Sequence, residues 1–250
     1  MSSAADFDWR QYDGVLFDLD GVITPTADFH EQAWGELFSD FDYTGADYLR
    51  HIDGKPRYDG VRSFLASRGV TLPDGNPDDP AGDDTVCALG NRKNQLFNTI
   101  LERDGIGPYP GSLATLDLLD AAGIPSAIVS SSKNARNVLD AAGLAERFDV
   151  VIDGLVAASE HIAGKPAPDM FLHAARRINV EPGRAVVVED AVSGVAAGAA
   201  GGFAVVIGVD RGAGADSLLD HGASFVVDDL GQLLDDGLLA EHRRTARPEA

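Results

Sequence analysis

The sequence contains a single cysteine, Cys87, among 250 residues. One thiol cannot form an intrachain disulfide, so a reducing compartment is the simplest expectation. No apolar run approaches the length of a membrane-spanning helix, and the first eight residues lack a basic stretch followed by an apolar one. We therefore expect a cytoplasmic protein that does not act in a membrane.

Positive charge is also scarce, with 20 Lys and Arg against 40 Asp and Glu, a net charge of -20 and a pI near 4.4. A field of this sign opposes binding to nucleic acid or to an anionic membrane surface, because both need a basic footprint. An anionic substrate would need a local cluster of Lys and Arg. The apolar fraction of 44% is ordinary for a folded protein, and this length allows one or two domains.

Strand patterns are nearly absent between residues 25 and 106, where helices are predicted over 27–38, over 45–67 and from 91 to about 105, with an exposed Pro- and Asp-rich loop at 73–84. From Pro108 onward, helical segments alternate with short Val- and Ile-rich strands. These strands are predicted at 126–131, 150–153, 185–189, 204–209 and 224–227. We therefore predict a doubly wound, Rossmann-like α/β core formed by 1–24 and 107–250, with an inserted helical cap domain at 25–106.

The stretch from Val15 to Thr24 begins as an apolar run typical of a buried strand and carries two acids at its end, Asp18 and Asp20. Side chains two residues apart on an extended backbone face the same side, so both carboxylates would share one small volume. A divalent cation would relieve their repulsion. The alternative is an acidic turn at a strand end with no further role.

Other polar groups fall where further strands end, namely Ser130–Ser132 and Glu189–Asp190, and right-handed crossovers bring such ends to one edge of a parallel sheet. A Gly164-Lys165-Pro166 turn lies between them in the sequence. Taken singly, Ser130 could be a helix N-cap, Lys165 a solvated lysine and Glu189–Asp190 an acidic helix start.

Taken together with the Asp-Leu-Asp-Gly opening, these groups resemble the four motifs of the haloacid dehalogenase-like superfamily of aspartate-dependent phosphotransferases. The resemblance implies that Asp18 is the nucleophile, which forms an aspartyl phosphate, and that Asp20 is the general acid and base. It implies that Ser130, Ser131 and nearby backbone N–H groups hold the phosphoryl oxygens and that Lys165 neutralises their charge. A Mg²⁺ ion would be bound by Asp18, Glu189, Asp190 and the main-chain carbonyl of Asp20.

The inserted segment resembles the beta-phosphoglucomutase group of that superfamily. The matching positions are Thr24, Thr26, Ala27, His30, Ala33, Trp34, Gly54, Arg57, Arg92–Asn94 and Ser132–Asn134. The resemblance implies that Arg57, Lys133 and Asn134 grip the distal phosphate of a phosphosugar and that Lys93 faces its hydroxyls or phosphate. It places Thr26 and Ser132 among the substrate-binding residues and makes His30 a link between cap closure and Asp20, although a histidine beside Trp34 is also typical of a packed core.

Three positions depart from that group, because Pro25, Gly60 and Ala191 replace an Asp and two Ser residues, and the 73–84 loop lengthens the cap. The same core residues serve a phosphosugar mutase or a phosphatase, and the cap favours the mutase. A dinucleotide-binding module is disfavoured because 193–202 lacks the G-x-G-x-x-G spacing. A phospho-acceptor signalling domain would need no cap, and a dehalogenase would need neither Asp20 nor a metal. The expected partner is a small phosphorylated sugar or metabolite, and we expect a monomer.

Overall fold

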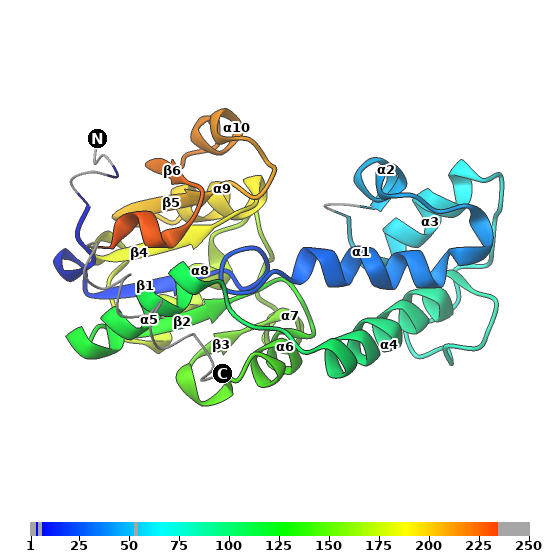
Figure 1. Cartoon of the computed structure of the whole chain (residues 1–250), viewed down its shortest axis with the longest axis horizontal. Helices are drawn as coiled ribbons and strands as arrows, with labels where there is room; N and C mark the ends of the chain where they lie inside the picture. The colour runs from blue at the N-terminus through cyan, green and yellow to red at the C-terminus, as the bar shows by residue number, and fades with distance from the viewer. Residues whose placement is uncertain (1–3, 5–6, 53–54, 235–250) are drawn as a thin grey trace, which may run out of the picture. The chain divides into compact units, whose positions relative to one another are not determined.

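The computed structural model describes residues 4, 7–52 and 55–234. The chain divides into two compact units, one formed by Met1–Pro25 with Ile106–Ala250 and the other by Thr26–Gly105 (Figure 1). Among the described residues, all strands lie in the first unit, and the regular elements of the second are helical. No helix in this described part is long and apolar enough to cross a membrane.

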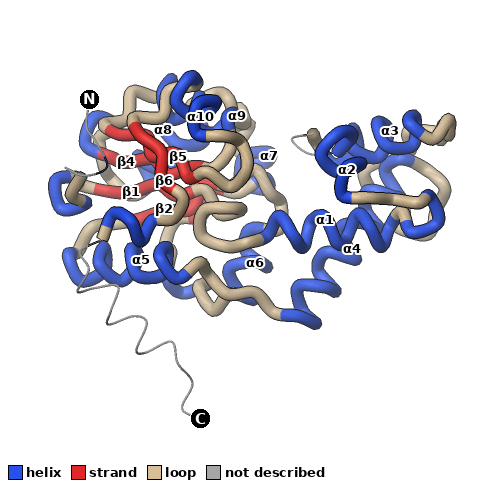
Figure 2. Tube along the Cα trace, turned by 45° about the horizontal axis from the view of Figure 1, so that its top comes forward, coloured by secondary structure: helices blue, strands red, loops and turns tan. Residues whose placement is uncertain are grey.

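The described residues of the first unit form a six-stranded parallel sheet in the order β3-β2-β1-β4-β5-β6, whose strands are labelled in Figure 1 and drawn in red in Figure 2. The strands are β1 Gly14–Phe17, β2 Ser126–Val129, β3 Val151–Ile152, β4 Ala185–Glu189, β5 Val205–Val209 and β6 Phe225–Val227. Strands β1, β4 and β5 are buried along their whole length. Continuous apolar runs of this kind are what a sheet covered on both faces requires. The doubly wound α/β class predicted from the sequence is confirmed.

Some strands are shorter than their sequence patterns indicate. The predicted strand at 150–153 is reduced to β3, two residues long. Asp153 leaves the strand because its carboxylate accepts hydrogen bonds from Leu155 N at 3.0 Å and Val156 N at 2.8 Å, which caps the next helix. A capping residue adjoining a strand is difficult to separate from it by pattern alone.

The crossover helices of the first unit are α5 Pro110–Ala122, α6 Ala135–Ala141, α7 Gly154–Ser159, α8 Asp169–Arg177, α9 Val192–Ala200 and α10 Ala215–Asp220, with short helical turns at Trp9–Gln11, Ala145–Arg147, Pro182–Arg184 and Leu230–Leu233. From β1 the chain adds strands in one direction as far as β3, and from β4 it adds them in the other. Right-handed crossovers therefore place the helices on opposite faces of the sheet.

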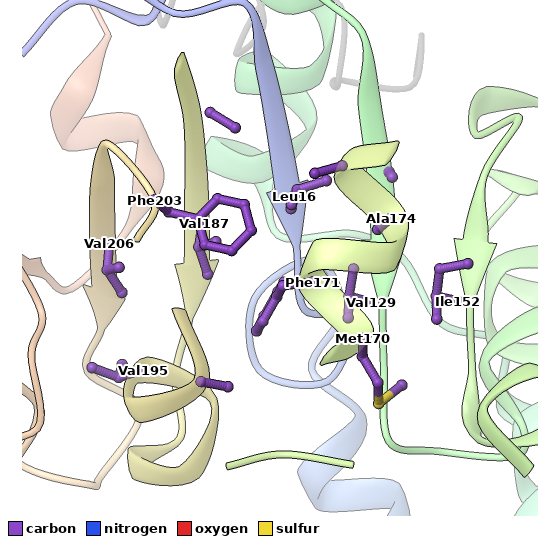
Figure 3. Packing of buried hydrophobic residues seen from close by; sticks show 14 of the residues in the cluster. Leu16, Val129, Ile152, Met170, Phe171, Ala174, Val187, Val195, Phe203 and Val206 are labelled. Atoms are coloured by element: carbon purple, nitrogen blue, oxygen red, sulfur yellow. The ribbon is translucent and has the colours of Figure 1, made fainter. Parts of the chain in front are cut away.

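One face of the sheet packs against α8 and α9 in a continuous apolar cluster (Figure 3). Leu16, Val129 and Val187 from neighbouring strands meet Phe171 of α8, and Val195 of α9 extends the same layer. All five side chains are fully buried. Burial of this kind contributes about 1.5–3 kcal/mol per large side chain, so the strand ends that carry the polar groups are held on a rigid support.

The second unit consists of α1 Thr26–Leu37, α2 Gly45–Asp47, α3 Arg57–Ser67 and α4 Val86–Asp104, with short helical turns at Ser39–Phe41 and Tyr48–Ile52. It has a core of its own, in which the rings of Phe38 and Phe64 stack with centroids 4.0 Å apart. The loop at 73–84 is largely exposed, as predicted.

The prediction that the last helix of this unit opens at residue 91 was wrong, because α4 begins at Val86. Thr85 caps the helix by accepting a hydrogen bond from Ala88 N at 3.0 Å. Gly90, a poor helix former, is buried within α4. A Cβ atom at Gly90 would lie 2.6 Å from the ring of Tyr58, so the glycine allows that ring to pack against α4.

Candidate active site

The polar groups predicted from the sequence meet where the strand order reverses. Strands β1 and β4 are neighbours, and the chain leaves them in opposite directions across the sheet. Asp18 directly follows β1 and Glu189 ends β4, and Asp18 N donates a hydrogen bond to Val188 O at 2.9 Å. Such a switch point is where open α/β sheets bind their ligands.

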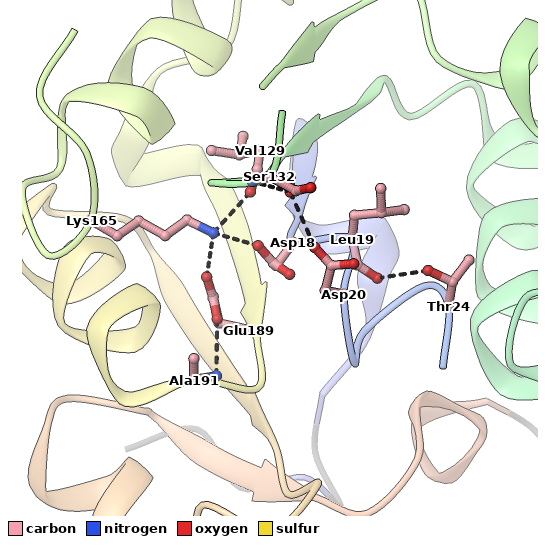
Figure 4. Close-up of polar contacts among 10 residues, drawn as sticks. Asp18, Leu19, Asp20, Thr24, Val129, Ser132, Lys165, Glu189 and Ala191 are labelled. Carbon is pink, nitrogen blue, oxygen red and sulfur yellow. Dashed lines mark hydrogen bonds and ion pairs between the residues drawn. The ribbon is translucent and has the colours of Figure 1, made fainter. Parts of the chain in front are cut away.

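Lys165 joins the two strand ends (Figure 4). Its Nζ atom lies 2.5 Å from Asp18 Oδ1, 2.5 Å from Glu189 Oε1 and 2.8 Å from Val129 O. The side chains of Lys165, Asp18 and Glu189 are 5%, 10% and 1% exposed, so water screens these contacts weakly. The lysine is therefore a structural partner of two carboxylates as well as a candidate phosphate ligand.

The charges of this cluster are strongly coupled. Burial raises the pKa of the Asp18 carboxyl to about 8, with the Lys165 ammonium opposing the rise and Glu189 and Asp20 adding to it. Burial also lowers the pKa of Lys165, but the two carboxylates outweigh it and leave that pKa above its ordinary value. Burial and the neighbouring acids raise the pKa of Asp190 well above its ordinary value. Additional positive charge next to these carboxyl groups would stabilise their ionised forms.

A divalent cation fits these residues. One carboxylate oxygen each from Asp18, Glu189 and Asp190 lies within 4.8 Å of the other two. Among the described residues, the Asp190 carboxylate has neither a hydrogen-bond nor an ion-pair partner, and hard oxygen donors are what Mg²⁺ prefers. Gly21 packs directly on this carboxylate, because a Cβ atom there would lie 1.9 Å from Asp190 Oδ2.

Asp20 and Ser130 are also brought together. Ser130 Oγ donates a hydrogen bond to Asp20 Oδ2 at 3.4 Å, and Ser132 N donates to Ser130 Oγ at 3.0 Å (Figure 4). Ser130 is fully buried, whereas Ser131 is exposed. The Ser132 N–H is therefore engaged by Ser130, although backbone N–H groups near Ser130 were predicted to hold phosphoryl oxygens.

The loop after Ser130 lies against the start of α7. Gly154 N donates a hydrogen bond to Ser132 O at 3.0 Å, and a Cβ atom at Gly154 would lie 2.7 Å from Ser131 O. Lys133 is exposed, and Asn134 is buried at the start of α6, where its N–H donates to Ser132 Oγ at 3.1 Å. The predicted substrate residues of the core thus form one short loop with a fixed backbone.

The helical unit holds the other predicted substrate residues. Lys93 Nζ lies 2.6 Å from His30 Nδ1, and the His30 ring stacks on Phe97 at 4.3 Å. An ammonium group can only donate, so Nδ1 accepts and the neutral ring carries its proton on Nε2. Burial and the charges of Lys93 and Arg57 lower the pKa of His30 well below its ordinary value. This histidine is therefore held neutral.

Arg57 and Thr26 lie in the same unit. Arg57 begins α3, and its NH2 group donates to Asn94 Oδ1 on α4 at 2.9 Å. Burial lowers the pKa of Arg57. Thr26 is fully buried at the start of α1, and Gly54 lies outside the described residues. The predicted site residues thus form two sets, one in each unit.

Sequence reasoning missed three residues that hold the turn after Asp18. Arg211 Nε donates to Gly21 O at 2.9 Å, Ser112 Oγ donates to Val22 O at 2.6 Å, and Tyr109 N donates to Ile23 O at 2.9 Å. Each bond ends on a main-chain carbonyl, so no pairing of residue types in the sequence could have indicated it.

Comparison with known proteins agrees with this geometry. The chain is 50% identical over 237 residues to a beta-phosphoglucomutase of Mycobacterium tuberculosis, and the aligned region covers 88% of this chain and 90% of that protein. It is 32% identical over 197 residues to hexitol phosphatase A of Escherichia coli, covering 77% of this chain and 81% of that protein. The crystal structure of a beta-phosphoglucomutase from Clostridium difficile superposes with a TM-score of 0.71 at 26% identity, covering 94% and 98% of the two chains.

A family model of haloacid dehalogenase-like hydrolases matches residues 12–202. The matched range contains both acids after β1, the serine after β2, Lys165 and the acidic pair at the end of β4. With the family resemblance confirmed in this way, the chain belongs to the haloacid dehalogenase-like hydrolase family.

Proposed function

We propose that the protein is a Mg²⁺-dependent phosphosugar mutase that converts beta-glucose 1-phosphate to glucose 6-phosphate. The observation that carries the proposal is the meeting of Asp18, Lys165, Glu189 and Asp190 at the switch point of the sheet. The 50% identity to relatives named beta-phosphoglucomutase supports the choice of substrate.

In this mechanism Asp18 first takes a phosphoryl group from glucose 1,6-bisphosphate and becomes an aspartyl phosphate, as the bond from phosphorus to the sugar oxygen breaks and a glucose monophosphate leaves. The phosphoryl group passes to the C6 oxygen of beta-glucose 1-phosphate, whose hydroxyl proton Asp20 accepts. After the bisphosphate reorients, Asp18 takes the phosphoryl group from C1, and Asp20 returns the proton to the leaving C1 oxygen. Atoms and charges balance over the cycle. In the first transfer the bond from phosphorus to Asp18 breaks as the bond to the C6 oxygen forms, and in the second the bond from phosphorus to the C1 oxygen breaks as the bond to Asp18 forms.

Lys165 offsets the charge of the transferring group, since its ammonium already lies 2.5 Å from the nucleophile. Asp18, Glu189, Asp190 and the main-chain carbonyl of Asp20 would hold Mg²⁺, which supplies electrostatic stabilisation of the phosphoryl oxygens. Ser130, Ser131 and the N–H groups around them are the proposed phosphoryl contacts within the core.

The helical unit is the proposed cap, which contributes sugar and distal-phosphate contacts from Thr26, His30, Arg57 and Lys93, with Ser132, Lys133 and Asn134 from the core loop. Arg57 and Lys93 supply local positive charge to a chain with a net charge of -20. A guanidinium group suits bidentate contact with a phosphate.

A phosphatase is the second candidate, favoured by the 32% identity to hexitol phosphatase A. The same aspartates would serve it, with water in place of the sugar hydroxyl as the acceptor. The two functions differ in how well the phospho-aspartate is protected from water.

The test incubates the purified protein with beta-glucose 1-phosphate, Mg²⁺ and a trace of glucose 1,6-bisphosphate, while glucose 6-phosphate and free phosphate are followed together. A mutase accumulates glucose 6-phosphate much faster than phosphate. Phosphate as the main product would replace this proposal with the phosphatase, and absence of both products would contradict the substrate.

A further inference from the structure

Arg211 follows β5 and lies at the same edge of the sheet as Asp18 and Glu189. Its guanidinium donates to Gly21 O at 2.9 Å and to Asp228 O at 2.8 Å, and it lies 3.7 Å from Asp229 Oδ2. The side chain is 23% exposed. The arginine therefore connects the loop after β5 and the end of β6 to the turn that carries Asp20.

Tyr109 completes the same support. Its ring centroid lies 3.8 Å from Arg211 Cζ, and its backbone N–H donates to Ile23 O at 2.9 Å. One residue thus holds the turn directly through its main chain and holds the arginine in place through its ring. A cation over an aromatic face is attracted by the ring, and more strongly where water is excluded.

Gly21 links this support to the carboxylates. Its φ angle is +77°, its N–H donates to Thr24 O at 2.9 Å, and its carbonyl accepts from Arg211. Both peptide groups of Gly21 are therefore fixed, although a glycine would otherwise move most freely. Gly21 packs directly on Asp190, so the orientation of Gly21 determines how much space the Asp190 carboxylate has. The preceding peptide group carries the main-chain carbonyl of Asp20.

We propose that Arg211 is a positioning residue for the cation site. It holds the Gly21 turn so that the Asp20 carbonyl and the Asp190 carboxylate face the same point. This inference rests on the proposed function in so far as the cation serves phosphoryl transfer. Partners that orient metal ligands typically change metal affinity by about 10- to 100-fold when removed.

The experiment measures Mg²⁺ and Mn²⁺ binding by titration calorimetry, and thermal unfolding, for the wild type, Arg211→Met and Arg211→Lys. Arg184→Met is the matched control, because Arg184 also forms a two-pronged contact, with Asp13, but beside the N-terminal ends of the strands. We expect cation affinity to fall at least about tenfold in Arg211→Met and to remain unchanged in Arg184→Met. Arg211→Lys should recover part of the loss, because one ammonium can still reach the Gly21 carbonyl.

Unchanged cation affinity in a folded Arg211→Met variant overturns the inference, as does a wild type that binds neither cation. If affinity falls in Arg211→Met while the wild type fails to turn over beta-glucose 1-phosphate, the positioning role holds and the proposed substrate is wrong. Turnover measured as a function of Mg²⁺ concentration distinguishes a positioning role from a general loss of structure. A positioning defect raises the Mg²⁺ concentration needed for half-maximal activity and is partly corrected by saturating Mg²⁺.

Discussion

The ammonium group of Lys165 lies 2.5 Å from the Asp18 carboxylate, and both side chains are at least nine-tenths buried. The nucleophile proposed for phosphoryl transfer is thus ion-paired before any substrate binds. Two opposing effects act on it, because burial raises its pKa while the lysine lowers it. The pair can serve catalysis only where positive charge keeps Asp18 ionised.

Replacing Lys165 by Met should leave Asp18 and Glu189 buried side by side without their shared cation. We expect the free energy of unfolding to fall by about 3–5 kcal/mol, the usual result of removing one partner of a buried ion pair. Saturating Mg²⁺ should restore part of this loss. Urea denaturation with and without Mg²⁺ measures both effects. Arg184→Met breaks an exposed ion pair, which water screens, and should cost far less; equal losses in the two variants would contradict the assignment.

Asp18→Asn preserves the size of the side chain and removes the nucleophile. We expect no covalent phosphate on this variant, whereas Asp20→Ala should still bind substrate but lose about 10²- to 10⁴-fold in turnover, the usual contribution of a general acid and base. Intact-protein mass after acid quench detects the aspartyl phosphate, and product formation gives the rates. Turnover at the wild-type level in Asp18→Asn would show that another group is the nucleophile.

The sequence predicted those parts of the site that follow directly from a strand. Asp18 and Glu189 end apolar runs, so their positions depend only on where a buried strand stops. The position of Lys165 came from the family resemblance, because its two partners are 147 and 24 residues away. Arg211 could not be predicted, since its bond ends on the main-chain carbonyl of Gly21, 190 residues earlier. The early start of α4 depends on the Thr85 cap and on the packing of the Tyr58 ring at Gly90, and helix propensity describes neither contact.

His30 should make the stability of the protein depend on pH. Its pKa is lowered in the folded state, so the unfolded chain takes up a proton first as pH falls. The contribution of the neutral histidine is fully present above about pH 6.5 and is lost as pH falls toward the folded-state pKa. Compared with His30→Gln, the wild type should lose up to about 1.4 kcal/mol per pH unit in that window. Parallel pH profiles of the two proteins in urea denaturation would refute this.

Arg57 offers a test of the cap residues, because its guanidinium is held by Asn94 at 2.9 Å. If it binds the distal phosphate, Arg57→Ala should reduce turnover of beta-glucose 1-phosphate by about 10-fold or more, the effect of losing one charged hydrogen bond of about 1.5–3 kcal/mol. Hydrolysis of a small aryl phosphate, which has no distal phosphate, should change little. Similar losses on both substrates would remove Arg57 from substrate recognition.

Gly194 in α9 provides the sharpest test of the carboxylate geometry. An alanine in a helix is ordinarily more stable than a glycine by about 1 kcal/mol. Here, however, the added Cβ atom would lie 1.7 Å from Glu189 Oε1 and 1.9 Å from its Cδ. Glu189 is 1% exposed and bonded to Lys165, so its carboxylate can move only by breaking that contact. Overpacking of this kind costs about 1–3 kcal/mol, which outweighs the gain in helix propensity.

We therefore expect Gly194→Ala to lower the free energy of unfolding slightly and to weaken Mg²⁺ binding by about 10-fold or more. Gly183→Ala is the control, since a Cβ atom there meets no atom within 4 Å. Calorimetric Mg²⁺ titrations of both variants decide the matter. Wild-type affinity in Gly194→Ala would mean that Glu189 is not needed to bind the cation and that its buried carboxylate serves Lys165 alone.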